Sequence, residues 1–256
     1  MSTAALITPM PAGEPAASLA EHREALARRA AWRLEDASAE TIIRWAVRTF
    51  GSRFAVTSSM ADAVLVDLVA RTAPGTDVLF LDTGYHFAET LTMRDAVATA
   101  YRGRIHLVTV EPEQTVAVQD AEHGPDLFAR NPDRCCFLRK VLPLDRVLAP
   151  YDAWCSGLRR DDSLTRSRTP VVDWDGRNGM VKVNPLARWT QSRVDAYIEA
   201  HGVLTNPLLA DGFASVGCSP CTRRASDGNA RAGRWAGTGK TECGIHLVGA
   251  SSGEDQ

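Results

Sequence analysis

The stretch RFAVTSSMADAVLVDLVARTAPGTDVLFLDTG, residues 53–84, contains two short apolar segments separated by a segment with helical periodicity. We predict buried strands at Arg53–Thr57 and Asp77–Leu81, and between them a helix at Asp62–Arg71 that Pro74-Gly75 ends. A strand, a helix and a second strand in this order predict a βαβ unit whose two strands are parallel.

Further segments repeat this alternation of strand and helix. We expect, in chain order, a helix at Thr41–Phe50 with Ser38 as its N-cap and Gly51 as its stop, a helix from about His86 to Tyr101, a strand at Arg104–Val110, a helix at Asp133–Leu148, a strand at Asp152–Ser156, a hairpin of Val171–Asp173 with Met180–Val183, and a helix from Thr190 to about His201. The sequence therefore predicts an α/β fold with a doubly wound, mainly parallel sheet and flanking helices.

Polar residues follow the first two predicted strands. Ser58 and Ser59 come directly after the first strand, and Asp82, Thr83 and Gly84 come after the second. Ligands of open parallel sheets bind at the carboxyl ends of the strands. Hydroxyl groups and the amides of a helix N-terminus suit a phosphate. We therefore expect these five residues to bind a substrate that carries an anionic group.

The composition is that of a packed globular protein. Of the 256 residues, 45% are hydrophobic and 23% charged, and the formal net charge of −2 argues against broad nucleic-acid binding. No apolar run is long enough to span a membrane, and the N-terminus lacks the pattern of a targeting peptide, so we expect a cytoplasmic protein. We predict an N-terminal extension with a helix at 1–35, one α/β domain at 36–221, and a flexible, mobile tail at 222–256.

Four of the six cysteines fall into two pairs, Cys135-Cys136 and Cys218-x-x-Cys221. In a cytoplasmic chain, clustered cysteines more often bind metal or perform redox chemistry than form disulfides. Four thiolates suit zinc or a four-iron cluster. Because neighbouring side chains diverge, the adjacent pair favours a cluster, whose irons spread over a wider face, over structural zinc. Buried free thiols are the third interpretation.

The other two cysteines lie in different surroundings. Cys155 lies in the apolar segment YDAWCSG and is expected to pack in the core. Cys243 lies in the predicted tail, three residues before His246 and downstream of Arg231 and Arg234. Positive surroundings lower the pKa of a thiol and favour the reactive thiolate, although an isolated tail cysteine is more often an incidental surface thiol.

Basic residues cluster in two further segments. Arg139 and Lys140 lie one turn after the first cysteine pair, and Arg159 lies in the loop GLRRDDS at 157–163. The non-functional interpretation is a basic surface exposed to solvent. The functional one, which we favour, is that these segments converge with the strand ends on an anionic ligand.

A series of short motifs runs from residue 53 to residue 246. They are LDTG at 81–84, CCxxRK at 135–140, GLRRDDS at 157–163, NPL at 184–186 and 206–208, GCSPCTR at 217–223, RxGR at 231–234 and ECGIH at 242–246. Together these motifs resemble the assimilatory sulfonucleotide reductases, specifically the branch that reduces adenylyl sulfate (APS).

The resemblance implies an adenine-nucleotide-alpha-hydrolase-like fold, related to the PP-loop enzymes, and a 4Fe-4S cluster on Cys135, Cys136, Cys218 and Cys221. It implies that Cys243 attacks the sulfur of APS, that AMP leaves, and that an S-sulfocysteine forms on the enzyme. Thioredoxin or a similar dithiol protein would then release sulfite. The sequence indicates no nucleic-acid or membrane partner and leaves a homo-oligomer open.

This chemistry assigns expected roles to the basic residues. Cys243, His246 and Lys140 are the expected catalytic residues. Arg159, Arg231 and Arg234 are expected to bind the substrate together with the serine and LDTG loops. The first loop reads SSMAD where ATP-pyrophosphatase relatives carry a Gly-Gly pyrophosphate loop, which disfavours ATP cleavage.

Three alternatives stay open at this point. A reductase of 3′-phosphoadenylyl sulfate (PAPS) would perform the same chemistry, but such enzymes typically lack the four cluster cysteines. A non-catalytic iron–sulfur sensor or nucleotide-binding protein would need the two cysteine pairs without Cys243. A zinc-stabilised nucleotide-binding module would hold zinc in place of iron.

Overall fold

The computed structural model describes residues 16–224 and 231–246, and within them six strands form one sheet with the order β3-β2-β1-β4-β6-β5. The strands are β1 (Phe54–Thr57), β2 (Thr76–Leu81), β3 (Ile105–Val110), β4 (Ala153–Cys155), β5 (Val172–Asp175) and β6 (Met180–Val183). Neighbouring strands are parallel except β5 and β6, which form an antiparallel pair. The predicted mainly parallel sheet and its hairpin are confirmed.

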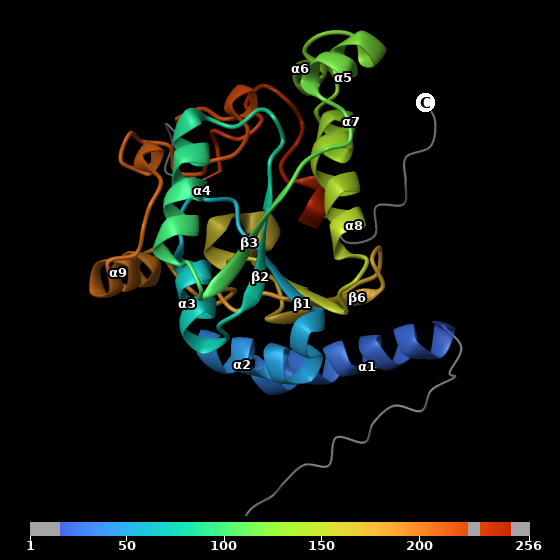
Figure 1. Cartoon of the computed structure of the whole chain (residues 1–256), viewed down its shortest axis with the longest axis vertical. Coiled ribbons are helices and arrows are strands. Elements are labelled where there is room, and N and C mark those ends of the chain that lie inside the picture. The colour runs from blue at the N-terminus through green and yellow to red at the C-terminus, as the bar shows by residue number, and fades with distance from the viewer. Residues whose placement is uncertain (1–15, 225–230, 247–256) are drawn as a thin grey trace, which may run out of the picture.

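Helices flank both faces of this sheet (Figure 1). They are α1 (Ala16–Leu34), α2 (Ala39–Phe50), α3 (Val64–Thr72), α4 (Ala88–Ala100), α5 (Val116–His123), α6 (Leu127–Arg130), α7 (Pro132–Cys136), α8 (Leu142–Leu148) and α9 (Gln191–His201). Phe54 and Val56 of β1 join the core shared with α2, α3 and α4, whereas Ala55 joins the core shared with Leu144 and Leu148 of α8. Successive side chains of β1 point to opposite faces of the sheet, so one strand contributes to the cores on both faces, as in a doubly wound fold.

The α3 helix lies at the centre of the larger core. All of its residues from Val64 to Ala70 are buried, which explains why its sequence is apolar on almost every side. The exception is Asp67, whose carboxylate accepts hydrogen bonds from the hydroxyl groups of Tyr101 at 3.2 Å and Tyr197 at 2.8 Å. A buried carboxylate is tolerated because these donors satisfy it, and it ties α3 to the end of α4 and to α9.

The capping residues predicted from the sequence lie at the ends of α2 and α9. The Ser38 side chain accepts from the Thr41 N–H at the start of α2, and the Thr190 side chain accepts from the Arg193 N–H at the start of α9, both at 3.3 Å. Gly51 ends α2 with φ of +56°, a conformation that glycine adopts at little cost. These capping predictions are confirmed.

The region of the first cysteine pair differs from the expected continuous helix at Asp133–Leu148. The α7 helix ends at Cys136, a π-helical turn covers Phe137–Val141, and α8 begins at Leu142. Pro143 has no N–H to donate, and its ring would clash with the carbonyl four residues back in a regular helix, so the wider turn before it relieves that clash. Such turns often occur at functional sites.

The two ends of the described chain both pack on the α/β domain. The α1 helix lies against β5 and β6, with Ala27 and Ala30 buried. Residues 231–246 lie against the π-helical turn and the 217–223 segment. The rest of the predicted extension and tail lies outside the described residues, and the mobility of the tail stays a prediction. Among the described helices, none combines the length and apolar character that a membrane crossing requires.

Candidate functional site

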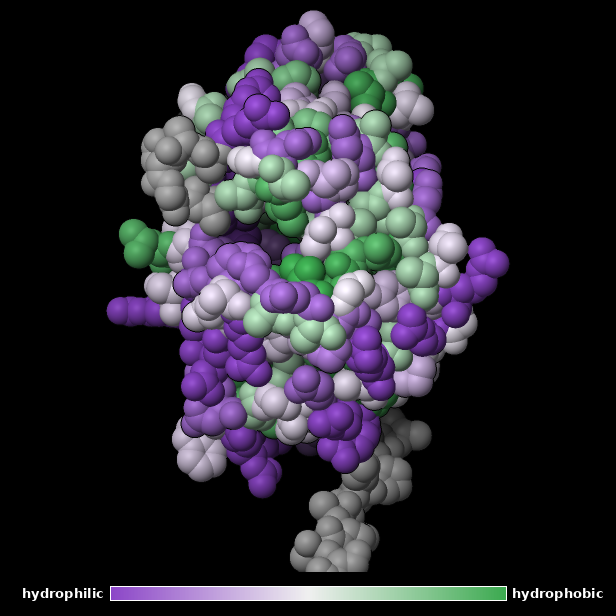
Figure 2. Space-filling model, turned by 90° about the vertical axis from the view of Figure 1, so that its left-hand side faces the viewer, coloured by the Kyte–Doolittle hydropathy of each residue, from purple (hydrophilic) through white to green (hydrophobic). Residues whose placement is uncertain are grey.

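A cavity of about 720 Å³ lies at the carboxyl ends of β1, β2 and β4. The hollow near the middle of Figure 2 lies on the side of the molecule where α9 and residues 205–217 line this cavity. The structure brings eight of the predicted site residues to its wall: Ser58, Ser59, Lys140, Arg159, Arg231, Arg234, Cys243 and His246. The size suits a small organic ligand, and the basic side chains suit an anionic one.

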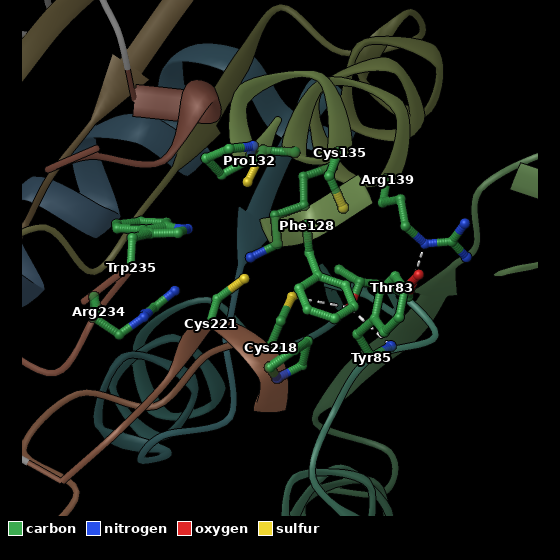
Figure 3. A pocket seen from close by; sticks show the side chains of 13 residues that line it. Thr83, Tyr85, Phe128, Pro132, Cys135, Arg139, Cys218, Cys221, Arg234 and Trp235 are labelled. Atoms are coloured by element: carbon green, nitrogen blue, oxygen red, sulfur yellow. Dashed lines mark hydrogen bonds between the residues drawn. The ribbon is translucent and has the colours of Figure 1, made fainter. Parts of the chain in front are cut away.

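A second, smaller pocket is lined by all four paired cysteines (Figure 3). Cys135 and Cys136 come from α7, and Cys218 and Cys221 come from the segment that forms a β-bridge with His86, just after the LDTG loop. Lys140, Arg234 and Trp235 line both pockets, so the two sites share a wall. The predicted convergence of the two cysteine pairs is therefore present in the fold.

The LDTG loop contributes to both pockets. Leu81 lines the large cavity and Thr83 lines the cysteine pocket, whereas among the described lining residues Asp82 and Gly84 occur in neither. The Thr83 hydroxyl lies 3.3 Å from the sulfur of Cys218, and the Thr83 carbonyl accepts from the buried guanidinium of Arg139. Gly84 has φ of +72° and lies against the same guanidinium, so the loop shapes the wall beside Cys218.

The four paired thiols surround one pocket, although in the part of the chain that the structure describes no three His, Cys, Asp or Glu side chains are grouped for a single metal ion. Burial together with the nearby Cys218 and Cys221 raises the pKa of Cys135 to about 11. A four-iron cluster takes one thiolate on each iron, so this spread donor set fits it.

Cys243 lines the large cavity, packs with Cys136 and Trp235, and is only 7% exposed. A hydrogen bond from the thiol of Cys136 holds the pKa of Cys243 well below its usual range, although burial opposes that shift. The charge of Lys140 and the N–H of Ile245 lower the pKa further. Lys140 is itself buried among the thiols of Cys136, Cys218 and Cys243, which raise its pKa and keep it charged. The site therefore favours a thiolate at Cys243.

The residue before Cys243 anchors the segment. The Glu242 carboxylate accepts two hydrogen bonds of 2.7 Å from Arg166, one of 3.1 Å from Arg231, and one of 2.9 Å from the N–H of Cys243. All three charged side chains are 10–11% exposed. Burial alone would raise the pKa of Glu242, but its hydrogen bonds with Arg166 and the charges of both arginines outweigh burial and lower it.

Residues 233–235 join this segment to the second cysteine pair. The Trp235 N–H donates to the Cys221 carbonyl at 2.9 Å, and the Arg223 N–H donates to the Gly233 carbonyl at 2.8 Å. A Cβ atom at position 233 would lie 2.0 Å from the carbonyl oxygen of Arg223, so only glycine fits there. The Arg234 guanidinium lies 4.6 Å from the centroid of the Trp235 ring, which covers the cysteine pocket.

Three residues of the site were missed by sequence reasoning. Glu242 stands in the ECGIH motif, but its carboxylate was given no role. Trp235 gives no periodic signal. Lys182 was included in a predicted strand without comment, although a lysine between two valines on a buried strand was a visible signal. Lysine is rarely fully buried unless it is paired.

The fold and the site together define an α/β protein with a basic cavity at its strand ends and a cysteine-based centre beside it. Its sequence matches the phosphoadenosine phosphosulfate reductase domain over residues 53–224, and the chain belongs to that family.

Curated relatives agree with this assignment. The chain is 60% identical to an adenosine 5′-phosphosulfate reductase of Streptomyces coelicolor over 227 residues, which cover 88% of this chain and 95% of the relative. It is 55% identical to an enzyme of the same name from Mycobacteroides abscessus over 223 residues, which cover 87% of this chain and 93% of the relative.

Solved structures agree on the fold. A phosphoadenylyl-sulfate (PAPS) reductase from Candida auris, in a phosphate complex, superposes with a TM-score of 0.65 at 30% identity, covering 77% of this chain and 96% of that one. The Candida glabrata FMN adenylyltransferase superposes with a TM-score of 0.52 at 12% identity over 81% of this chain and 74% of that one, which supports the fold class alone.

Proposed function

We propose that this chain reduces adenosine 5′-phosphosulfate to sulfite and AMP in assimilatory sulfate reduction, with Cys243 as the nucleophile. The observation that carries the proposal is the buried Cys243 thiol, favoured as a thiolate, in the wall of a basic cavity at the strand ends. The names of relatives 55–60% identical to this chain support the substrate. Six cysteines without a disulfide favour a reducing compartment such as the cytoplasm.

The reaction consists of two transfers at the Cys243 sulfur. The thiolate attacks the sulfur of the substrate, a sulfur–sulfur bond forms, and the bond to the bridging oxygen breaks so that AMP leaves with the electron pair. A dithiol protein such as thioredoxin then attacks the resulting S-sulfocysteine. Its two thiols become a disulfide, sulfite leaves with two electrons, and the Cys243 thiol is restored.

Basic residues of the cavity neutralise the charge that shifts between sulfate and phosphate oxygens. Lys140 and Arg234 lie at the wall shared with the cysteine pocket, nearest to Cys243. Arg159 donates to Asp162 and Gln191, while its Nη1 is buried with no hydrogen-bond partner among the described residues. Donors already fixed in place stabilise developing charge without reorganisation.

Cys135, Cys136, Cys218 and Cys221 are the residues that would hold a 4Fe-4S cluster. When bound, such a cluster cross-links α7 to the 218–221 segment directly behind the shared wall. As a cluster ligand, Cys136 would be a thiolate and would have no proton to donate to Cys243. Lys140, Arg234 and the Ile245 N–H then remain to hold Cys243 as a thiolate.

Intact-protein mass spectrometry tests the proposal. Anaerobically purified protein incubated with adenosine 5′-phosphosulfate should gain one sulfonate on Cys243, and added dithiol should remove it and release sulfite. Cys243→Ser should form neither product, whereas Cys155→Ala, the matched change at a buried core cysteine, should form both. An adduct on another residue, or sulfite from Cys243→Ser, would contradict the mechanism.

The PAPS reductase from Candida auris supports a second candidate substrate, the 3′-phosphorylated nucleotide. The chain's higher identity to enzymes named for the unphosphorylated one disfavours it. Measuring kcat/KM for both nucleotides decides between them, and a preference for the 3′-phosphorylated one would overturn our choice.

A further inference from the structure

One buried cation beside the nucleophile has no part in the chemistry described so far. Lys182 lies on β6 between Val181 and Val183 and is 6% exposed. Its Nζ lies 3.3 Å from Nδ1 of His246 and 4.6 Å from the ring centroid of Trp154. Burying an ammonium group costs free energy unless it gains a partner, and here that partner is an imidazole that lines the cavity.

The contact fixes the protonation state of the histidine. Burial lowers the pKa of Lys182 to about 8, against the raising effect of Asp175 and Asp173, so the ammonium form still predominates at neutral pH. An ammonium group donates hydrogen bonds and accepts none. Nδ1 of His246 must therefore accept, which leaves the single ring proton of the neutral imidazole on Nε2.

Other contacts hold the ring in place. The backbone N–H of His246 donates to the Cys243 carbonyl at 2.9 Å. The imidazole is parallel to the Trp154 ring within 6°, with centroids 6.2 Å apart. Burial and the cations Lys182, Arg166, Arg231 and Lys140 keep the ring neutral, because they hold the pKa of His246 well below its usual range.

We infer that Lys182 is a positioning residue for His246, holding the imidazole as a neutral Nε2–H donor to an anionic oxygen of the substrate beside Cys243. The inference rests on the proposed function for the identity of that oxygen. The Lys182–His246 contact itself is a property of the chain and is testable without substrate. A neutral donor polarised by a cation behind it stabilises negative charge without bringing a proton that could transfer to the nucleophile.

Nitrogen-15 NMR of protein labelled at histidine tests the contact directly. The chain has six histidines, and the signal that disappears in His246→Gln assigns the ring. In the unsubstituted protein we expect a protonated Nε2 and a hydrogen-bonded, unprotonated Nδ1. Lys182→Met should remove the Nδ1 hydrogen bond and mix the two tautomers, whereas Lys182→Gln, whose amide also donates, should keep the original pattern. Identical spectra for all three proteins would overturn the inference.

Single-turnover formation of the Cys243 sulfonate tests the consequence. Lys182→Met should slow it by about ten- to a hundredfold, a loss similar to or below that of one preorganised donor, and Lys182→Gln should recover most of the rate. Combining Lys182→Met with His246→Ala should be no slower than His246→Ala alone, since Lys182 acts through the ring. Additive losses would mean that Lys182 acts elsewhere.

A second pair of variants tests the donor without changing Lys182. In His246→Gln the amide nitrogen can reach the position of Nε2, whereas in His246→Asn it reaches only that of Nδ1. Sulfonation should therefore be faster in His246→Gln, and equal rates would overturn the inference. If the unsubstituted protein forms no sulfonate, the proposed function fails, and the NMR result still decides whether Lys182 sets the His246 tautomer.

Discussion

The β1–α3–β2 unit and the 231–246 segment are both packed against the rest of the protein, but different forces hold them. In the first, residues such as Val56, Leu68 and Val78 are at most 1% exposed and pack on one another. In the second, Glu242 is held between Arg166 and Arg231. The central unit is therefore stabilised mainly by apolar burial, and the segment that carries Cys243 mainly by ion pairs and backbone hydrogen bonds.

This difference matches what each region has to do. Apolar packing keeps the strand ends fixed, so the cavity retains its shape. An ion-paired segment can exchange its contacts for water or for ligand charges at a smaller net cost than a packed core can. The proposed chemistry requires this, because the sulfur of Cys243 has to meet the substrate inside the cavity and a dithiol protein outside it.

The largest expected effect comes from Glu242→Gln. The change removes the carboxylate that Arg166 and Arg231 share, although Arg166 keeps its ion pair with Asp162, and breaking a buried ion pair costs about 3–5 kcal/mol. We expect that cost to appear as opening of the 231–246 segment. Measured by iodoacetamide labelling and peptide mass spectrometry, Cys243 should be alkylated at least a hundredfold faster, while the melting temperature changes little.

The matched control is Glu113→Gln. Glu113 pairs with Arg146 on the surface and is 79% exposed, and such pairs contribute roughly 0–1 kcal/mol. Neither Cys243 alkylation nor stability should change. If Glu242→Gln left Cys243 protected, the ion pairs would not be what holds the segment.

A slightly smaller effect is expected from Leu68→Ala in α3, which should destabilise the whole chain without opening the 231–246 segment. Leu68 is 1% exposed in the larger core, and truncating a buried leucine costs about 2–5 kcal/mol. Urea denaturation should show this loss in the free energy of unfolding of the whole chain. Alkylation of Cys243 under native conditions should stay slow. Rapid alkylation at urea concentrations well below the unfolding transition would show that the two regions are not separately held.

The same contrast explains how far sequence reasoning reaches. Burial on both faces of β1 and around α3 requires runs of apolar residues, and these appear in the sequence as FAV and VLVDLVA. The rule that ligands bind at the carboxyl ends of parallel strands also predicted that Ser58, Ser59 and the basic residues would meet. Caps such as Ser38 and Thr190 act on neighbouring residues, so a local pattern identifies them.

Long-range polar contacts leave no such pattern. Glu242 meets Arg166 across 76 residues, and nothing in either local sequence identifies the partner. The LDTG loop was expected at the cavity because it follows β2, but Arg139, 56 residues away, draws Thr83 toward the cysteine pocket. The family resemblance identified the LDTG and ECGIH motifs but did not predict which pocket each motif lines.

Acid should release the 231–246 segment before it unfolds the sheet. Glu242 has a lowered pKa in the folded protein, so its stabilising contribution is present above its ordinary pKa of 4.5 and is lost as the pH falls through the folded value. Only part of the Glu242 population is protonated at a pH that leaves the sheet folded, so the loss is smaller than in Glu242→Gln at neutral pH. Limited digestion with pepsin, which is active in acid, should cut within 231–246 first, and cuts within 54–81 at the same pH would contradict this order.

The smallest expected effect is that of Ser38→Ala. The Ser38 hydroxyl caps α2 through the Thr41 N–H, and loss of an N-cap costs about 1 kcal/mol. Ser52, an exposed serine just after α2, is the control, and Ser52→Ala should change the free energy of unfolding by less than about 0.5 kcal/mol. Because α2 packs on α3, urea denaturation should report the loss as a property of the whole domain. Cys243 alkylation should be identical in both variants, because α2 packs in the larger core and the ion pairs of Glu242 involve Arg166 and Arg231. Faster alkylation in Ser38→Ala alone would show that the 231–246 segment depends on the packed core as well as on its charges.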